Sequence, residues 1–369
     1  MRIRRIEQQP ITEKASMKTE RKLVINDKAC TFRSGETVLE VAGANDIHIP
    51  TLCHLKRATP TGACRICMVE VEGARSLLAA CATPANDGMV IYTESEKVMA
   101  ARKEIIKLML SNGDHNCLLC TSSGDCTVQN LAYQYQVPVD CYPVTPSRQE
   151  IEKDNPFIVR ELSRCILCGR CVQVCKDIQV NNAIDYGFRG SELKIITAGN
   201  KTLKDSECVY CGDCVQVCPT GALVEKSILY NVRSWETKKI RTTCGYCGVG
   251  CQVELHTKDN RVVRVTGVED AAPNYGSLCV KGRFAFDFID SPERMKTPLI
   301  KKNGEFQEAS WDEALELVAK KFSDIREQYG SDSFGVLTSA RMTNEENYIA
   351  QKFARAVLKT NNVDHCARL

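Results

Sequence analysis

The sequence lacks the features that mark several large classes of protein. It contains no apolar run of about 18 residues, and residues 1–20 have no apolar segment of the kind found in secretory signals. We therefore expect neither a membrane span nor export. The net charge is only +3, which gives no strongly basic surface for nucleic acid. No G-x-G-x-x-G loop occurs, so we expect a nicotinamide nucleotide to bind elsewhere than on this chain.

Cysteine, by contrast, is abundant. The chain of 369 residues has 22 cysteines, gathered in closely spaced groups. Because disulfides are rare in the cytosol, such groups in a chain without an export signal indicate metal binding. We therefore expect a cytoplasmic, α+β multidomain metalloprotein, preceded by a disordered leader at residues 1–20.

The strongest pattern is a repeat between residues 165 and 219. Each half reads C-x2-C-x2-C-x3-C, and VQVC occurs at residues 172–175 and again at 215–218. Bacterial ferredoxins use this spacing to hold two [4Fe–4S] clusters, and the fourth cysteine of each run ligates the other cluster. Eight structural or disulfide-bonded cysteines are the alternative. The pattern assigns one cluster to Cys165, Cys168, Cys171 and Cys218, and the other to Cys208, Cys211, Cys214 and Cys175, within a domain at residues 157–230.

Residues 21–94 predict a small β-rich domain. Strands are expected at Lys22–Asn26 and Ala29–Arg33 around a turn at Asp27, followed by a helix at Thr37–Ala44. Four thiols in a C-x10-C-x2-C-x13-C pattern suit a [2Fe–2S] cluster, with a structural zinc site as the alternative. They are Cys53, Cys64, Cys67 and Cys81. Cys30 is expected to be a small buried hydrophobic residue.

The long first gap in this pattern resembles the variant ferredoxin domain of two protein families. They are the large iron–sulfur subunit of respiratory complex I and the iron-only hydrogenases, so the resemblance implies a β-grasp fold for residues 21–94. In both families the next segment holds a [4Fe–4S] cluster through three cysteines and a histidine four residues before the first of them. Here residues 95–135 supply Cys117, Cys120 and Cys126, but Gly113 stands at the histidine position. We expect His115 to be the fourth ligand, with Cys141 as the alternative.

Around these motifs the sequence predicts a helix and a connector. Ser95–Asn112 is expected to form an amphipathic helix that ends at Asn112-Gly113. Its apolar face contains Val98, Met99, Ile105, Ile106, Met109 and Leu110. Residues 136–156 contain four prolines, which predicts an extended linker.

Residues 238–295 predict a further [4Fe–4S] domain of a different fold. Its ligands, in a C-x2-C-x3-C-x27-C pattern, are Cys244, Cys247, Cys251 and Cys279. A hairpin with its turn at Asp259-Asn260 is expected between the third and fourth cysteines. Lys281 follows the last ligand and could connect the cluster electrostatically with an anionic cofactor; an ordinary exposed lysine is the alternative.

Residues 296–369 predict the start of an α/β domain. Ser310 and Glu313 predict a capping box for a helix that ends at Gly330, and Thr343 with Glu346 predicts another through Val357. Ser333–Thr338 is expected to be a buried strand. It has no evident partner, and because one strand does not form a sheet, we expect the chain to stop inside this domain.

The motifs CGYCGVGC, LCVKGRF, SARMTNEENY and TNNVDHCARL in residues 240–369 resemble the molybdopterin oxidoreductase family, and in particular formate dehydrogenase catalytic subunits. The first 240 residues resemble the iron–sulfur extension of cytosolic NAD(P)-linked formate dehydrogenases of anaerobic bacteria. The resemblance implies oxidation of formate to CO2, or the reverse, at molybdenum or tungsten held by two molybdopterin guanine dinucleotides. It places Lys281 between cluster and pterin, and Arg341 and Asn344 in a loop that contacts the cofactor.

In that family the residue after DHCARL is the selenocysteine or cysteine that ligates the metal. The sequence stops at Leu369, so we expect a reading frame ended at a selenocysteine codon, an arbitrary end being the alternative. The catalytic residues are then expected after Leu369, and Cys366 is not expected to be a ligand. The chain alone would carry one [2Fe–2S] and four [4Fe–4S] clusters.

Five clusters in one chain indicate electron transfer between distant sites. The resemblance implies that the [2Fe–2S] end meets a flavin-containing NAD(P)H dehydrogenase or a hydrogenase subunit. The alternative is a non-catalytic electron relay related to the complex I subunit or to iron-only hydrogenase, although the group that begins at Cys244 does not fit the hydrogenase.

Overall fold

The computed structural model describes residues 21–138, 142–143 and 151–366, apart from the side chain of residue 366. The chain divides into two units, Met1–Asn112 with Leu131–Thr145 and Gly113–Asn130 with Pro146–Leu369. No helix in the described ranges has the length and apolar character needed to cross a membrane.

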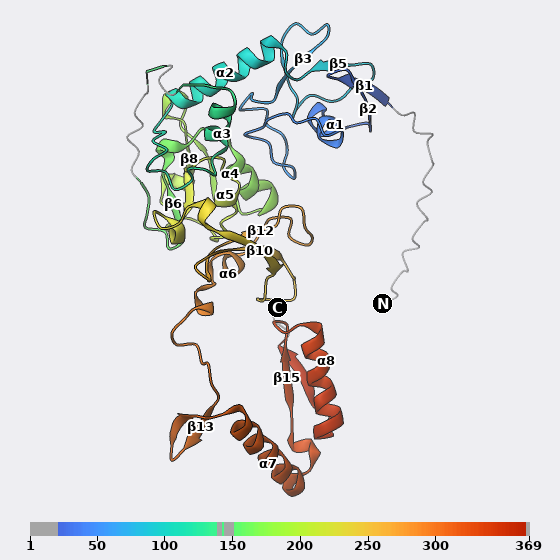
Figure 1. Ribbon diagram of the computed structural model, residues 1–369, viewed down its shortest axis with the longest axis vertical. Coiled ribbons are helices and arrows are strands. Elements are labelled where there is room, and N and C mark those ends of the chain that lie inside the picture. The colour runs from blue at the N-terminus through green and yellow to red at the C-terminus, as the bar shows by residue number, and fades with distance from the viewer. Residues whose placement is uncertain (1–20, 139–141, 144–150, 367–369) are drawn as a thin grey trace, which may run out of the picture. The chain divides into compact units, whose positions relative to one another are not determined.

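The first unit is built on a five-stranded mixed sheet in the order β2-β1-β5-β3-β4 (Figure 1). Strand β1 (Arg21–Ile25) pairs antiparallel with β2 (Lys28–Phe32) and parallel with the central strand β5 (Val90–Tyr92). Strand β3 (Met68–Val71) pairs antiparallel with both β5 and β4 (Leu78–Ala79). Helix α1 (Val38–Ala44) packs its apolar face on this sheet, which is the expected β-grasp arrangement.

Local sequence explains these elements. Asn26 and Asp27 adopt left-handed backbone conformations, with φ of 48° and 63°, which lets the β1–β2 turn be tight. Thr37 caps α1 through a complete capping box with Glu40. Cys30 is 1% exposed in β2, as predicted for a small core residue.

Helix α2 (Glu96–Ser111) begins after the N-cap Ser95 and ends at Asn112, close to the predicted bounds. Its buried side chains are Val98, Arg102, Ile106 and Leu110. Val98, Ile106 and Leu110 are buried as predicted, while the other three predicted residues, Met99, Ile105 and Met109, are half-buried. The buried face also contains Arg102, a cation that the pattern of apolar residues did not reveal. Helix α3 (Thr127–Gln134) follows.

The second unit begins with the ferredoxin repeat. Each half contains a short helix, α4 (Arg170–Gln173) or α5 (Asp213–Gln216), which follows a left-handed glycine, Gly169 or Gly212. Strand β6 (Ile158–Arg160) pairs antiparallel with β9 (Leu223–Glu225), and β7 (Ile184–Gly187) with β8 (Lys194–Thr197). Residues 151–156 of the predicted linker contact this repeat, because Glu152 forms an ion pair of 3.0 Å with Arg160.

A three-stranded antiparallel sheet follows, in the order β10-β11-β12. Strands β11 (Gln252–Lys258) and β12 (Arg261–Gly267) form the predicted hairpin, with left-handed Asp259 and Asn260 at its turn. The edge strand β10 (Lys238–Thr243) was not predicted. Helix α6 (Val280–Phe284) begins directly after Cys279.

The last segment contains a hairpin of β13 (Leu299–Lys302) and β14 (Glu305–Glu308), then helices α7 (Trp311–Tyr329) and α8 (Asn344–Phe353). Thr343 and Glu346 form the predicted capping box of α8. Ser310 caps α7, but the predicted reciprocal contact from Glu313 is replaced by an ion pair with Lys302 at 2.7 Å.

Two predictions about the strand in this segment are wrong. Strand β15 (Val336–Ser339) does have a partner, since it pairs in parallel with β16 (Val363–Cys366). It is also not buried, because Leu337 is 83% exposed. The strand was identified by its apolar residues, but nothing in the described chain covers this side of it.

Candidate iron–sulfur centres

The four cysteines predicted to hold a [2Fe–2S] cluster lie together in the first unit. Cys53, Cys64, Cys67 and Cys81 are all at most 9% exposed. Hydrogen bonds join the thiols of Cys53 and Cys64, of Cys53 and Cys81, and of Cys67 and Cys81. Those from Cys64 and Cys81 lower the pKa of Cys53 strongly, and the bond from Cys81 lowers the pKa of Cys67 to about 7. The same hydrogen bonds, together with burial, raise the pKa of Cys64 and of Cys81 well above the usual value of a thiol. Four buried thiols within hydrogen-bond reach of one another can serve as the ligand set of one small iron cluster.

The loop that carries Cys64 and Cys67 is fixed by Arg102 of α2. Its Nε donates to the carbonyl of Ile66 at 3.1 Å, and its Nη2 to the carbonyl of Met68 at 2.9 Å. The remaining nitrogen, Nη1, donates to the hydroxyl of Tyr135 at 3.0 Å. Arg102 is 1% exposed, so its guanidinium provides the hydrogen bonds that these carbonyl oxygens would otherwise receive from water.

Cys117, Cys120 and Cys126 lie on one loop of the second unit, with half-buried His115 two residues before Cys117. Burial raises the pKa of Cys126 to about 11 and also raises the pKa of Cys117. Two arginines hold the backbone of this loop, because Arg233 donates to the carbonyl of Cys120 at 2.5 Å and Arg164 to that of Asn116 at 3.3 Å. The alternative fourth ligand, Cys141, lies outside the described residues.

The backbone at Gly113 explains why the histidine position of the resembling families is changed here. Gly113 has φ of +100°, and a Cβ on it would lie 2.0 Å from the carbonyl oxygen of Ser163. The amide of Asp114 donates to this same oxygen at 2.8 Å. Since no side chain fits at residue 113, this position cannot supply the fourth ligand, and His115 stays the predicted one with Cys141 as the alternative.

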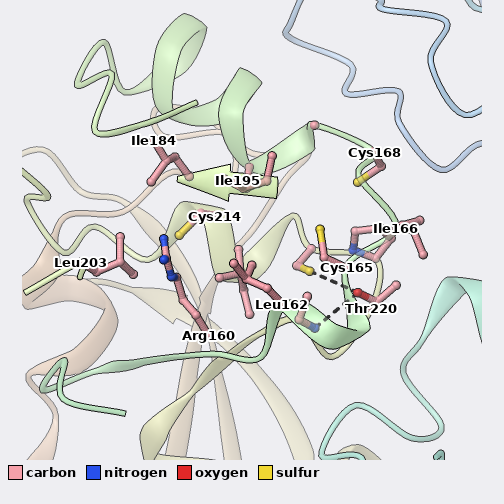
Figure 2. A pocket seen from close by; sticks show the side chains of 16 residues that line it. Arg160, Leu162, Cys165, Ile166, Cys168, Ile184, Ile195, Leu203, Cys214 and Thr220 are labelled. Atoms are coloured by element: carbon pink, nitrogen blue, oxygen red, sulfur yellow. Dashed lines mark hydrogen bonds between the residues drawn. The ribbon is translucent and has the colours of Figure 1, made fainter. Parts of the chain in front are cut away.

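The eight cysteines of the ferredoxin repeat line two cavities that share Cys214. One apolar cavity of about 30 Å³ is lined by Cys165, Cys168, Cys171 and Cys218, together with Cys214 from the other set. A second cavity, of about 20 Å³, is lined by Cys175, Cys208, Cys211 and Cys214. Figure 2 shows Cys165, Cys168 and Cys214 around the first cavity, among Leu162, Ile184 and Ile195. Each cavity thus draws thiols from both halves of the repeat, as the ferredoxin pattern requires.

Burial is the main cause of the raised pKa values of these thiols. It raises the pKa of Cys165 to about 11 and that of Cys168 to about 12, and it also raises the pKa values of Cys171 and Cys214 well above the usual value of a thiol. The free thiols would therefore be protonated at neutral pH. Binding of iron as thiolate would release those protons, so cluster binding and folding of this domain are coupled.

Cys244, Cys247, Cys251 and Cys279 form the last group. The amide of Cys244 donates to the carbonyl of Cys251 at 2.8 Å, and the charges of Cys247 and Cys279 both contribute to the raised pKa of Cys244, after burial. Cys247 and Cys279 are exposed, so this group opens to the surface. Lys281 is exposed on α6, Arg341 is exposed after β15, and Asn344 is the exposed first residue of α8.

Among the described residues, no three potential ligands lie close enough to bind a single metal ion. All 20 cysteines with described side chains are free of disulfides.

Five family descriptions match successive parts of the chain. Residues 19–96 match the 2Fe-2S iron-sulfur cluster binding domain, and residues 102–139 the NADH-ubiquinone oxidoreductase-G iron-sulfur binding region. Residues 155–224 match the ferredoxin-like domain of NADH-quinone oxidoreductase subunit 3. The remainder matches the molybdopterin oxidoreductase Fe4S4 domain at residues 237–291 and molybdopterin oxidoreductase at residues 294–369.

The similar proteins are named for two different activities, formate dehydrogenase and NADPH-Fe(3+) oxidoreductase. Putative formate dehydrogenase YrhE of Bacillus subtilis is 38% identical over 378 residues, which cover 91% of this chain and 38% of that protein. NADPH-Fe(3+) oxidoreductase subunit alpha of Geobacter sulfurreducens is 39% identical over 347 residues, 94% of this chain and 40% of that subunit. The chain thus spans about two fifths of the length of these relatives.

A solved structure is also similar. It is the NAD+-reducing [NiFe]-hydrogenase in the H2-reduced state, with a TM-score of 0.54 and 29% identity. The similarity covers 57% of this chain and 90% of that one.

Proposed function

Since this chain consists of iron–sulfur domains followed by the start of a molybdopterin oxidoreductase domain, we propose that it carries electrons from formate oxidation. Electrons would enter at the Cys244 group from molybdenum or tungsten bound by two molybdopterin guanine dinucleotides. They would leave through the [2Fe–2S] cluster to a flavin-containing NAD(P)H dehydrogenase or hydrogenase subunit in the cytoplasm. CO2 reduction is the same path in reverse.

The observation that carries this proposal is the set of ligand groups themselves. The ferredoxin cavities have thiols from both halves of the repeat, and the Cys244 group follows on the same unit. In this proposal the ligands are the 19 cysteines of the five groups and His115. The residues of this chain exclude water and set the potential of each cluster, while the clusters supply the redox chemistry.

Three residues are proposed to face the pterin. Lys281 is exposed two residues after Cys279, so its ammonium is available to an anionic group beside the cluster. Arg341 lies in the loop between β15 and α8, and Asn344 is the first residue of α8. The side-chain amide of Asn347 fixes the backbone of this loop, because it donates to the carbonyls of Ser339 and Met342 at 3.3 Å.

A second candidate follows from the Geobacter relative, whose name gives NADPH and Fe(III) as its reactants. The two candidates differ in the electron donor. The test is to purify the native complex through a tag on this chain, without oxygen, and to add formate or NADPH separately.

If the formate proposal is right, formate alone bleaches the visible absorbance of the clusters, and the complex then reduces NAD(P)+. Bleaching by NADPH with Fe(III) as acceptor, and none with formate, would favour the second candidate and contradict the first. Lys281→Ala is expected to slow cluster reduction by formate, whereas chemical reduction by dithionite stays unchanged.

A further inference from the structure

Helix α6, which begins directly after Cys279, is embedded in the ferredoxin repeat. Phe284 stacks on Phe157 with ring centroids 4.7 Å apart and belongs to the apolar core of the repeat. Its neighbour Arg283 is completely buried. Gly212 permits this packing, since a Cβ there would lie 2.3 Å from Cδ of Arg283.

The guanidinium of Arg283 binds the ligand loop of one ferredoxin cluster. Nη2 pairs with Oδ1 of Asp213 at 2.6 Å, Nε donates to the carbonyl of Cys211 at 2.7 Å, and Nη1 donates to Oε1 of Gln216 at 2.8 Å. Asp213 lies between the proposed ligands Cys211 and Cys214. The side chains of Arg283 and Asp213 are 0% and 3% exposed.

The same ferredoxin side chains also bind the backbone around the last cluster. Oδ1 of Asp213 accepts from the amide of Leu278, the residue before Cys279, at 3.2 Å. Gln216 exchanges two hydrogen bonds with the backbone of Gly267, at 2.9 and 3.0 Å. One buried carboxylate therefore contacts the flanks of ligands from two different clusters.

A buried ion pair adds little net stability, because desolvation of both charges offsets their attraction. The better-supported role of a buried ion pair is to fix the groups that it joins in one geometry. Electron transfer through protein falls steeply with distance, so the spacing of two clusters is a geometry that matters for function.

We propose that Asp213 and Arg283 are positioning residues that hold the cluster of Cys244, Cys247, Cys251 and Cys279 at a fixed distance from that of Cys175, Cys208, Cys211 and Cys214. The inference rests on the proposed role of the chain in electron transfer. In the step that depends on them, one electron leaves one reduced cluster and enters the other, and no bond forms or breaks.

The test is electron paramagnetic resonance of the full chain after anaerobic reduction with dithionite. Two reduced clusters held this way interact magnetically. The wild-type spectrum is therefore expected to show a splitting from this pair in addition to that between the two clusters of the ferredoxin repeat, and the splitting from this pair is the one that the variants test. Asp213→Asn keeps the size of the side chain and removes its charge, and it is expected to lose the splitting at unchanged iron content. Arg283→Lys is expected to restore only part of it relative to Arg283→Gln, because an ammonium cannot reach all three acceptors.

Arg264→Gln is the matched control. Arg264 pairs with fully buried Glu225 at 2.9 Å and also joins β12 to the ferredoxin repeat, but it contacts neither Cys211 nor Leu278. The control is expected to keep the splitting. If Asp213→Asn fails to retain iron, Gln216→Met, which removes only neutral contacts to Arg283 and Gly267, is expected to weaken the splitting instead.

The inference is overturned if iron-replete Asp213→Asn or Gln216→Met shows the wild-type splitting, if the control loses it equally, or if the wild-type clusters do not interact. Wild-type signals that are individually normal but unsplit contradict only the positioning role. Absence of the cluster signals themselves would contradict the proposed function.

Discussion

Replacing Arg102 by methionine tests how the [2Fe–2S] ligand loop is held. The buried guanidinium of Arg102 satisfies the carbonyls of Ile66 and Met68, on either side of Cys67, and the hydroxyl of Tyr135. Methionine has a similar length but no donor. The change would leave these three oxygens without their partner inside the first unit.

The size of the effect follows from the number of acceptors. Each buried acceptor left unsatisfied costs about 1–3 kcal/mol, while removal of a desolvated cation returns part of this. We expect a net loss of about 3–5 kcal/mol, which for a domain of this size lowers Tm by more than about 10 °C.

The assay is a thermal scan of the anaerobic chain, followed by the visible absorbance and the electron paramagnetic resonance signal of the [2Fe–2S] cluster. Lys97→Met on the same helix is the control, because Lys97 is exposed and its ion pair with Glu70 lies at the surface. The reasoning is refuted if Arg102→Met loses its [2Fe–2S] signal at the same temperature as the wild type and the control.

Three further outcomes are expected. His115→Ala should lose the signal of one [4Fe–4S] cluster and about four iron atoms per chain; full iron content would exclude His115 as a ligand. Gly113→Ala should destabilise the same cluster although residue 113 is no ligand, because its Cβ meets the carbonyl of Ser163; a wild-type melting curve would contradict this. Burial lowers the pKa of His256 from 6.5 to about 4. The unfolded chain therefore takes up this proton first, so stability is complete above pH 6.5 and declines as the pH falls towards 4. His256→Asn should therefore make the free energy of unfolding, measured by urea titration, fall less steeply between pH 6.5 and pH 4. The same pH dependence as in the wild type would contradict the lowered pKa of His256.

The cysteine groups were predictable because ligand spacing is a local property of the sequence. The ferredoxin pattern predicted that thiols from both halves of the repeat meet, and each of the two cavities is lined by cysteines of both halves, with Cys214 lining both. The assignment of these cysteines to the two clusters stays a prediction. Helix starts were equally predictable from local sequence, since Thr37 and Thr343 each form a capping box with a glutamate only three residues later. His115 as a ligand, and the roles of Lys281, Arg341 and Asn344, stay predictions.

What sequence reasoning missed depends on distant partners. Arg102 contacts a carbonyl 36 residues away, and Arg283 contacts Asp213 70 residues away, so no local pattern indicates either. The position of Arg102, four residues after Val98 and four before Ile106, was the one available signal. Strand β10, with six exposed residues, has no alternation of apolar side chains, and β16 is too short and polar to be recognised before its pairing with β15 is known.

The central claim is that this chain is a path of five iron–sulfur clusters, and iron analysis of anaerobically purified protein tests it most directly. The account predicts about 18 iron atoms per folded chain, distributed over one [2Fe–2S] and four [4Fe–4S] clusters. Correctly folded protein that is colourless and gives no cluster signal after reduction would contradict it.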